Sequence, residues 1–287
     1  MLIFRREARG KSKSIFKKMK TGKTTIILII ALCSVLTAGA QTSGFSLGLK
    51  AGLGIPNLTA GTVTTPLSED YASRLGLYTG IVAEYQTEKW FGLRAELNYS
   101  SKGGQRKGMQ ALPLAEEMQL LWQMLPLLGI IPEEYMYADI KSEAILNYIE
   151  IPVLAKSSFR LNSKINFYLE AGPYVGFILK AENITSGSSG IHVDKAGLIA
   201  IDAILELAGQ PVVGSVSFDH NQDITNDVNT VNFGGQGAVG FELVMNSGKL
   251  FIEGGGNYGF IPIQKDKANG SNNAGAGTVT LGYLFNL

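Results

Sequence analysis

The side chains best suited to chemistry in this sequence lie together in one polar stretch. Asp219 and His220 are adjacent, Asp223 follows shortly after them, and His192 is the other histidine of the chain. An imidazole beside carboxylates could bind a metal ion or serve a surface hydrolase. No serine, cysteine or second histidine stands at a spacing that would complete such a site. We therefore favour solvated loop residues, and we expect no catalytic residue, no metal site and no cofactor.

Two glycine patterns resemble nucleotide-binding motifs but lack the required context. Gly235, Gly237 and Gly240 match G-x-G-x-x-G, which binds dinucleotides where it follows a strand and opens a helix. Here the pattern lies inside an alternating stretch that opens no helix. The triplet Gly22–Thr24 lacks the upstream glycine of a phosphate-binding loop. Neither pattern predicts a nucleotide cofactor.

Charged residues at alternate positions of otherwise apolar stretches form the third candidate group. They are Lys50, Glu84, Arg94, Glu96, Glu150, Lys156, Glu170, Lys180, Glu242 and Glu253. A buried charge is costly unless an opposite charge accompanies it. Eight strands enclose an interior that side chains can fill. We therefore predict a neutralising network in the interior of a barrel, and we favour it over an open channel.

The elements that position these charges have a period of two, which is clearest between Asn147 and Glu182. From Ile165 to Ala181 every second residue is apolar, and the intervening residues are mostly polar, small or phenolic. The side chains of a strand alternate between its two faces. The alternation outlasts an ordinary strand of ~5–6 residues and exceeds the ~9–11 residues that a tilted strand needs to cross a bilayer. This pattern predicts transmembrane β-strands.

The same alternation recurs along the chain and predicts eight strands. Their approximate ranges are 45–55, 75–86, 90–100, 147–159, 165–182, 231–244, 250–261 and the segment that ends at Leu287. Long and short connections alternate, and the longest are 101–143 and 183–230. Outer-membrane barrels have short periplasmic turns and longer extracellular loops. We predict an all-β fold, an eight-stranded antiparallel transmembrane β-barrel with two helix-containing extracellular loops.

The first 40 residues have the features of a cleaved signal peptide. A lysine-rich segment precedes the apolar run Thr24–Thr37, and Ala38-Gly39-Ala40 supplies the small residues of a cleavage site. We therefore divide the chain into a signal peptide, 1–40, and a barrel domain, 41–287. Cleavage would remove Cys33, the one cysteine of the sequence. Either Met1 or Met19 could be the start.

Composition limits the partners. The chain has 287 residues and a net charge of +1, so it has no basic surplus with which to neutralise nucleic-acid phosphates. The length suits one barrel or two ordinary soluble domains. We expect outer-membrane lipid, and no nucleic acid, as a partner.

Two stretches within the long connections have a helical period. They are Leu112–Leu125 and Asp194–Ala208, the second with Asp194 as its N-cap. The helices would pack on each other or on the barrel rim, which we favour, or meet a partner or the outer leaflet. In the second case Leu121, Trp122 and Leu125 would make the contact, because exposed large apolar residues mark interfaces.

Several strand sequences resemble one family. The segments 48–58 (GLKAGLGIPNL), 147–156 (NYIEIPVLAK) and 168–179 (YLEAGPYVGFIL) are similar to strands of the PorT-like outer-membrane β-barrel family, found mainly in Bacteroidetes. Asn232 stands where relatives often carry an acidic residue. The resemblance implies the barrel fold and an outer-membrane location. Its implication for function is weaker, since the namesake supports a secretion system and fold does not fix function.

These observations lead to one preferred function and two alternatives. We expect a non-enzymatic barrel whose loops serve interaction in the cell envelope, with an envelope or secretion-system protein as partner. A narrow passive pore is the alternative. A surface hydrolase is the third and weakest candidate.

Overall fold

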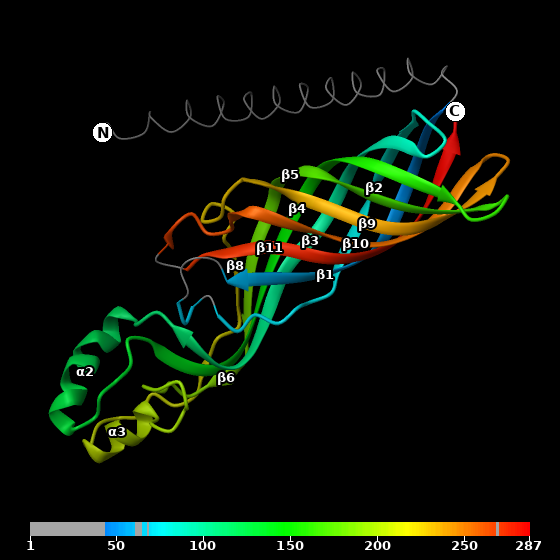
Figure 1. The fold of residues 1–287 in the computed structure, drawn as a ribbon. Helices are drawn as coiled ribbons and strands as arrows, with labels where there is room; N and C mark the ends of the chain where they lie inside the picture. The colour runs from blue at the N-terminus through cyan, green and yellow to red at the C-terminus, as the bar shows by residue number, and fades with distance from the viewer. Residues whose placement is uncertain (1–43, 61–64, 68, 268–269) are drawn as a thin grey trace, which may run out of the picture.

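A computed structural model describes residues 44–60, 65–67, 69–267 and 270–287. The predicted signal peptide lies outside these residues and stays a prediction. Within them, eight strands close into a ring in which every pairing is antiparallel (Figure 1). In ring order they are β1 (Phe45–Ala60), β2 (Gly76–Gln86), β3 (Phe91–Leu112), β4 (Met136–Arg160), β5 (Ile165–Ser186), β9 (Val231–Met245), β10 (Gly248–Pro262) and β11 (Asn272–Asn286). Pairing of β1 with β11 closes the ring, so the predicted eight-stranded antiparallel barrel is confirmed.

The two faces of the barrel wall have opposite polarity. In β1, Leu49 and Leu53 are exposed on the outside, whereas Lys50 between them is only 3% exposed. The same alternation runs through the other strands of the ring, with large apolar side chains outside and charged or phenolic side chains inside. An apolar outer surface around a polar interior is the arrangement of outer-membrane barrels.

Outward-facing aromatic side chains lie near both ends of the barrel wall. Near the short turns, Phe167 packs against Phe241 with ring centroids 5.4 Å apart. Towards the other end, Phe233 packs against Phe260 at 6.1 Å. Along β5, the stretch from Phe167 to Phe177 is about as long as the ~9–11 residues of a membrane-crossing strand. These two levels therefore delimit the band that meets lipid, because aromatic girdles flank the apolar band of outer-membrane barrels.

Beyond the second aromatic level, β3, β4 and β5 continue as an arm, which we define as residues 101–142 and 180–224 (Figure 1). The β3–β4 ladder keeps one register out to the pair Leu112–Met136. The short strand β8 (His220–Asp223) pairs with β5. The expectation that 101–143 and 183–230 are loops is therefore wrong in part. Strands of the arm lie in water, so they need no apolar face. The sequence therefore lacks the apolar residue at every second position that identifies the strands in lipid.

A small helical cap ends the arm. It consists of η1 (Glu116–Met118), α2 (Gln119–Met124), η2 (Leu125–Leu128) and α3 (Ile201–Leu207). Strands β6 (Ser188–Ser189) and β7 (Val216–Ser217) form a separate two-stranded sheet. None of the described helices is long and apolar enough to span a membrane.

Both predicted helices are present but shorter than expected. The second begins at Ile201 and not at Asp194. The Asp194 carboxylate accepts hydrogen bonds from the backbone N–H groups of Leu198 and Ile199. Gly197, which lies between Asp194 and Leu198 in the sequence, has a φ of 69°, in the left-handed region that favours glycine. Asp194 therefore closes a turn, and the helix starts after it.

Candidate functional site

Arg94, on β3, is the centre of the charge network inside the barrel. Its side chain is fully buried and lies 3.0 Å from Glu84, 2.9 Å from Glu170 and 2.9 Å from Glu253. These carboxylates come from β2, β5 and β10, so one guanidinium connects four strands. The planar group can serve several carboxylates because its donors point in different directions within one plane.

Two lysines extend the network on either side of Arg94. Lys50 Nζ lies 2.8 Å from Glu96 and 2.8 Å from Glu253. Lys156 Nζ lies 2.6 Å from Glu84 and also binds Glu242. Each lysine therefore bridges two carboxylates. The structure thus brings together eight of the ten predicted residues, namely Lys50, Glu84, Arg94, Glu96, Lys156, Glu170, Glu242 and Glu253.

Lys102 and Lys249 also contribute charge, and sequence reasoning did not find them. Lys102 is almost fully buried; its Nζ lies 2.6 Å from Glu150 and donates to Asn257 Oδ1 at 2.7 Å. Lys249 Nζ lies 2.7 Å from Glu84. A signal for Lys102 was present, because it keeps the inward phase of Arg94 and Glu96. The sequence nevertheless predicts a loop there, because the outward residues beside Lys102 are not apolar.

Lys180 is a correction to the predicted network. Its side chain is 51% exposed and pairs with Glu182 at 2.7 Å, on the arm. The β4–β5 register shifts there, so that Tyr148 faces Ile178 whereas Asn147 faces Lys180. The additional residue in β5 is a β-bulge, and a shift of one residue moves each following side chain to the opposite face. The hydrogen bond from Lys180 lowers the pKa of Glu182.

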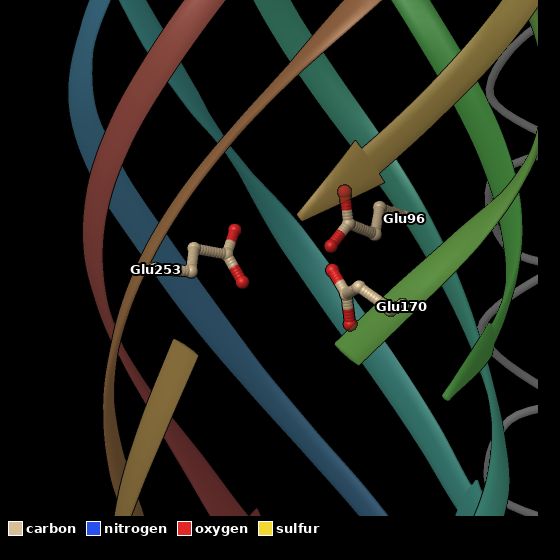
Figure 2. Close-up of side chains that lie close together, drawn as sticks. All are labelled: Glu96, Glu170 and Glu253. Atoms are coloured by element: carbon tan, nitrogen blue, oxygen red, sulfur yellow. The ribbon is translucent and has the colours of Figure 1, made fainter. Parts of the chain in front are cut away.

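Three carboxylates come close enough to resemble a metal site. Figure 2 shows Glu96, Glu170 and Glu253 with their carboxylate groups directed towards one another. They provide oxygen atoms within 4.8 Å of one another, and they are the one such group among the described residues. Calcium and magnesium prefer oxygen ligands of this kind. Here, however, the ammonium of Lys50 and the guanidinium of Arg94 already neutralise these oxygens, so the group fits an ion-pair network better than a metal ion.

Aromatic rings fill the space around the cations. The guanidinium of Arg94 lies 5.1 Å from the ring centroids of both Tyr168 and Phe251. The Tyr168 hydroxyl donates to Glu253 at 2.8 Å. Gly240 leaves room for this tyrosine, because a Cβ at that position would lie 2.5 Å from the ring. The centre of the lumen is therefore packed with side chains and does not form an open passage there.

The polar loop residues do not combine into a catalytic site. The Asp219 carboxylate accepts a hydrogen bond from Gly187 N–H at 3.0 Å. It also accepts one from Ser217 at 3.3 Å, so it holds the loop together. His220 and Asp223 lie on β8 and are exposed. In the described part of the chain, these residues belong to no group with metal-ligand geometry.

The two helical stretches pack on each other, as the favoured interpretation predicts, and Trp122 and Leu125 lie in the core between them. Trp122 is 7% exposed, Leu125 is fully buried, and Leu121 packs partly buried against them. The Trp122 indole N–H donates to Glu133 O at 2.8 Å. These residues form the core of the cap and are not a free contact surface. The exposed apolar side chains of this segment are others, namely Leu120, Met124, Leu127, Leu128 and Ile131.

The family follows from comparison of the sequence with family models. Residues 39–265 match the model described as the outer membrane protein beta-barrel domain. The chain belongs to this family. As a member of the outer membrane protein beta-barrel family with the fold described above, it is an outer-membrane β-barrel protein. A comparison with curated proteins found no match.

Solved structures of outer-membrane proteins are also similar. Neisserial surface protein A is 13% identical, with 85% of this chain and 98% of that chain covered and a TM-score of 0.38. Ail of Yersinia pestis, crystallised with the heparin analogue sucrose octasulfate, is 10% identical, with 85% and 100% covered and a TM-score of 0.35. OprG of Pseudomonas aeruginosa is 8% identical, with 85% and 98% covered and a TM-score of 0.33. Likenesses this low do not bear on function.

Proposed function

We propose that this protein is a non-enzymatic, PorT-like outer-membrane barrel whose arm serves interaction in the cell envelope and supports secretion. In this proposal the short turns and both ends of the mature chain are periplasmic, and the arm is extracellular. The observation that carries the proposal is the arm itself, a continuous extension of three barrel strands that ends in a packed helical cap. Such a rigid extension holds the cap at a fixed place relative to the membrane.

The cap carries an apolar surface that would suit a protein partner. Leu127 is 82% exposed, Leu128 is 61% exposed and Ile131 is 89% exposed. Contiguous exposed apolar residues of this size mark contact sites in soluble surroundings. Trp122 and Leu125 of the same segment are buried in the core of the cap.

The closed lumen supports an interaction role over a passive pore. Arg94, Tyr168 and Phe251 occupy the middle of the barrel, where a narrow pore would have to conduct. In planar bilayers we expect the purified barrel to give no discrete conductance steps. Reproducible single-channel steps would favour the passive pore instead.

A site-specific photocrosslinker tests the interaction role directly. Placed at Ile131, which is 89% exposed on the same surface, it should give a discrete product with an envelope or secretion-system protein in cells of the native host. The same crosslinker at Lys89, in an exposed turn at the other end of the barrel, is the matched control. The double variant Leu127→Ser/Leu128→Ser should lose the product and reduce the amount of secreted protein, while the barrel still folds. Unchanged secretion after deletion of the whole protein would contradict the secretion role.

A further inference from the structure

A small polar pocket lies on the arm, away from both the lumen network and the cap surface. It has a volume of about 210 Å³, and its polar lining comes from Asp70, Arg106, Lys107, Gln110, Tyr137 and Lys195. Arg106, Lys107 and Gln110 belong to β3, and Tyr137 belongs to β4. Segments distant in sequence therefore converge on one pocket that no part of the proposed function uses.

The charge of this pocket is positive. Its lining includes three cationic residues, Arg106, Lys107 and Lys195, and one carboxylate residue, Asp70. Lys195 Nζ lies 3.3 Å from Asp70, and both side chains are more than half exposed. An exposed pair of this kind contributes little, about 0–1 kcal/mol, so Lys195 can turn to another anion at small cost. The pocket is therefore suited to a negatively charged group.

Arg106 is held in place for such a group. Its guanidinium lies 4.7 Å from the centroid of the Tyr71 ring and donates to Pro66 O at 3.3 Å. Its Nε is buried and has no hydrogen-bond acceptor among the residues that the structure describes. A buried donor without an acceptor is costly, and an oxyanion would satisfy it.

The outer edge of β3 adds a backbone donor. The backbone N–H and C=O of Gln105 both bond to Ala72, so they point away from β4. Backbone groups alternate along a strand, so the N–H of Lys107 points to the same edge. In the described part of the chain, no strand pairs with this edge beyond Gln105. The pocket thus offers a backbone N–H beside its cationic side chains.

Gln110 indicates that the ligand carries hydroxyl groups as well as charge. The residue is only 5% exposed, and its Nε2 donates to Ile140 O. Its Oε1 is buried and has no hydrogen-bond donor among the described residues. An amide oxygen can only accept hydrogen bonds, so it would repel an anion but accept from a hydroxyl. A ligand with an anionic group at one end and a hydroxyl group at the other has the chemistry of a sugar ester.

We propose that this pocket binds a phosphate or sulfate monoester of a single sugar unit. Arg106, Lys107 and Lys195 bind the oxyanion, and Gln110 accepts a hydrogen bond from a sugar hydroxyl. A volume of about 210 Å³ is below the ~300–1,000 Å³ of drug-sized ligand sites, which limits the ligand to one such unit.

The position of the pocket favours a saccharide ester from outside the membrane over a lipid headgroup. Tyr99 lies opposite Ile149, which pairs with Phe177 at the second aromatic level. Between Tyr99 and Arg106, β3 extends roughly 20 Å at ~3.3 Å per residue. Because barrel strands tilt by ~35–45°, the height above that level is smaller, roughly 15 Å, and a headgroup at the membrane surface would still have to cover it to reach the pocket.

Calorimetry on the full-length barrel in detergent tests the proposal. Glucose 6-phosphate and glucose 6-sulfate should bind, and glucose should not. In the double variant Lys107→Gln/Lys195→Gln, affinity for glucose 6-phosphate should fall at least about tenfold, because two charge-assisted contacts are lost. The matched control Lys89→Gln/Lys164→Gln makes the same charge change in exposed turns at the other end and should bind as the unchanged protein does.

Two further measurements make the test decisive. Gln110→Leu should weaken binding of glucose 6-phosphate more than binding of inorganic phosphate, which lacks the sugar hydroxyls. Vesicles of phosphatidylcholine with phosphatidic acid test whether a lipid headgroup is the ligand. If the barrel binds these vesicles and the double variant Lys107→Gln/Lys195→Gln does not, the assignment to a saccharide is overturned. Equal affinities of the folded double variant and its control for glucose 6-phosphate would overturn the oxyanion site. Folding of each variant is verified by heat-modifiable migration.

Discussion

Arg94 on β3 and Glu253 on β10 form a 2.9 Å ion pair across the lumen, although their strands are not neighbours in the ring. Backbone hydrogen bonds hold each strand only to its two neighbours. Ion pairs of this kind add connections across the barrel and fix its cross-section. They also place charge where a conducting path would run, so the same contacts stabilise the wall and fill the lumen.

The first prediction concerns Arg94 itself. Arg94→Gln should lower the free energy of unfolding by about 3–5 kcal/mol, because it leaves buried carboxylates without their cation. Arg160→Gln is the matched control at an exposed end of β4 and should cost about 0–1 kcal/mol. Urea unfolding in detergent, followed by tryptophan fluorescence, gives both values. Similar midpoints for the two variants would mean that water reaches the lumen and solvates its charges.

A second prediction tests the pair Lys102–Glu150, which sequence reasoning divided between a loop and a strand. Lys102→Met and Glu150→Gln should each destabilise the barrel, because each leaves the other partner buried. The double variant should cost less than the sum, with a coupling energy of about 0.5–3 kcal/mol. A double-mutant cycle by urea unfolding measures this coupling. Additive costs would show that the two side chains do not interact in the folded protein.

The third prediction concerns the glycines of the wall. Gly240→Ala should destabilise the barrel by about 1–3 kcal/mol, because the new Cβ would lie 2.5 Å from the Tyr168 ring and 2.6 Å from Ile252 O. Gly254→Ala is the control, since nothing lies within 4 Å of a Cβ there. The fraction of heat-modifiable, folded barrel after refolding reports the difference. Equal folding yields would contradict the close packing around Tyr168.

The fourth prediction tests the orientation. Protease added to intact cells should cut the arm near Leu207, which is 90% exposed at the end of α3 in the cap. It should spare the turn between β9 and β10, which the proposal places in the periplasm. The paired strands β3 and β4 should resist cleavage between Ser101 and Leu112, because their backbone is held in the ladder. Cleavage confined to the β9–β10 turn would reverse the orientation.

The barrel was predictable from sequence because lipid outside and charge inside require opposite residues at successive positions. The same requirement assigns Lys50, Arg94 and Lys156 to the inward face from their phase in the alternation alone. It fails where the surroundings change. On the arm, water replaces lipid on the outer face, so the apolar half of the pattern disappears and the sequence predicts a loop around Lys102.

Local irregularities were beyond the sequence for a different reason. The bulge in β5 depends on how Ile178 and Lys180 meet Tyr148 and Asn147 on the neighbouring strand. No periodicity within β5 records that pairing, so the alternation alone predicts the wrong face for Lys180. The burial of Trp122 likewise depends on Val193 and Ile201, which are distant in sequence. A helical period shows that one face is apolar but does not show what covers it.

The last prediction separates the two roles of the cap. Trp122→Ala removes a buried side chain and its hydrogen bond to Glu133 O, so it should destabilise the cap by about 3–5 kcal/mol. Leu127→Ser changes an 82% exposed side chain and should leave the packing of the cap unchanged. Limited proteolysis of the purified barrel should therefore cut the cap of Trp122→Ala much faster than that of Leu127→Ser, while the barrel itself resists in both. Crosslinking should show the complementary result, with the partner lost in Leu127→Ser although the cap is intact. If Leu127→Ser retains the partner as fully as the unchanged protein, the exposed apolar surface is not the contact, and another face of the arm must carry the interaction.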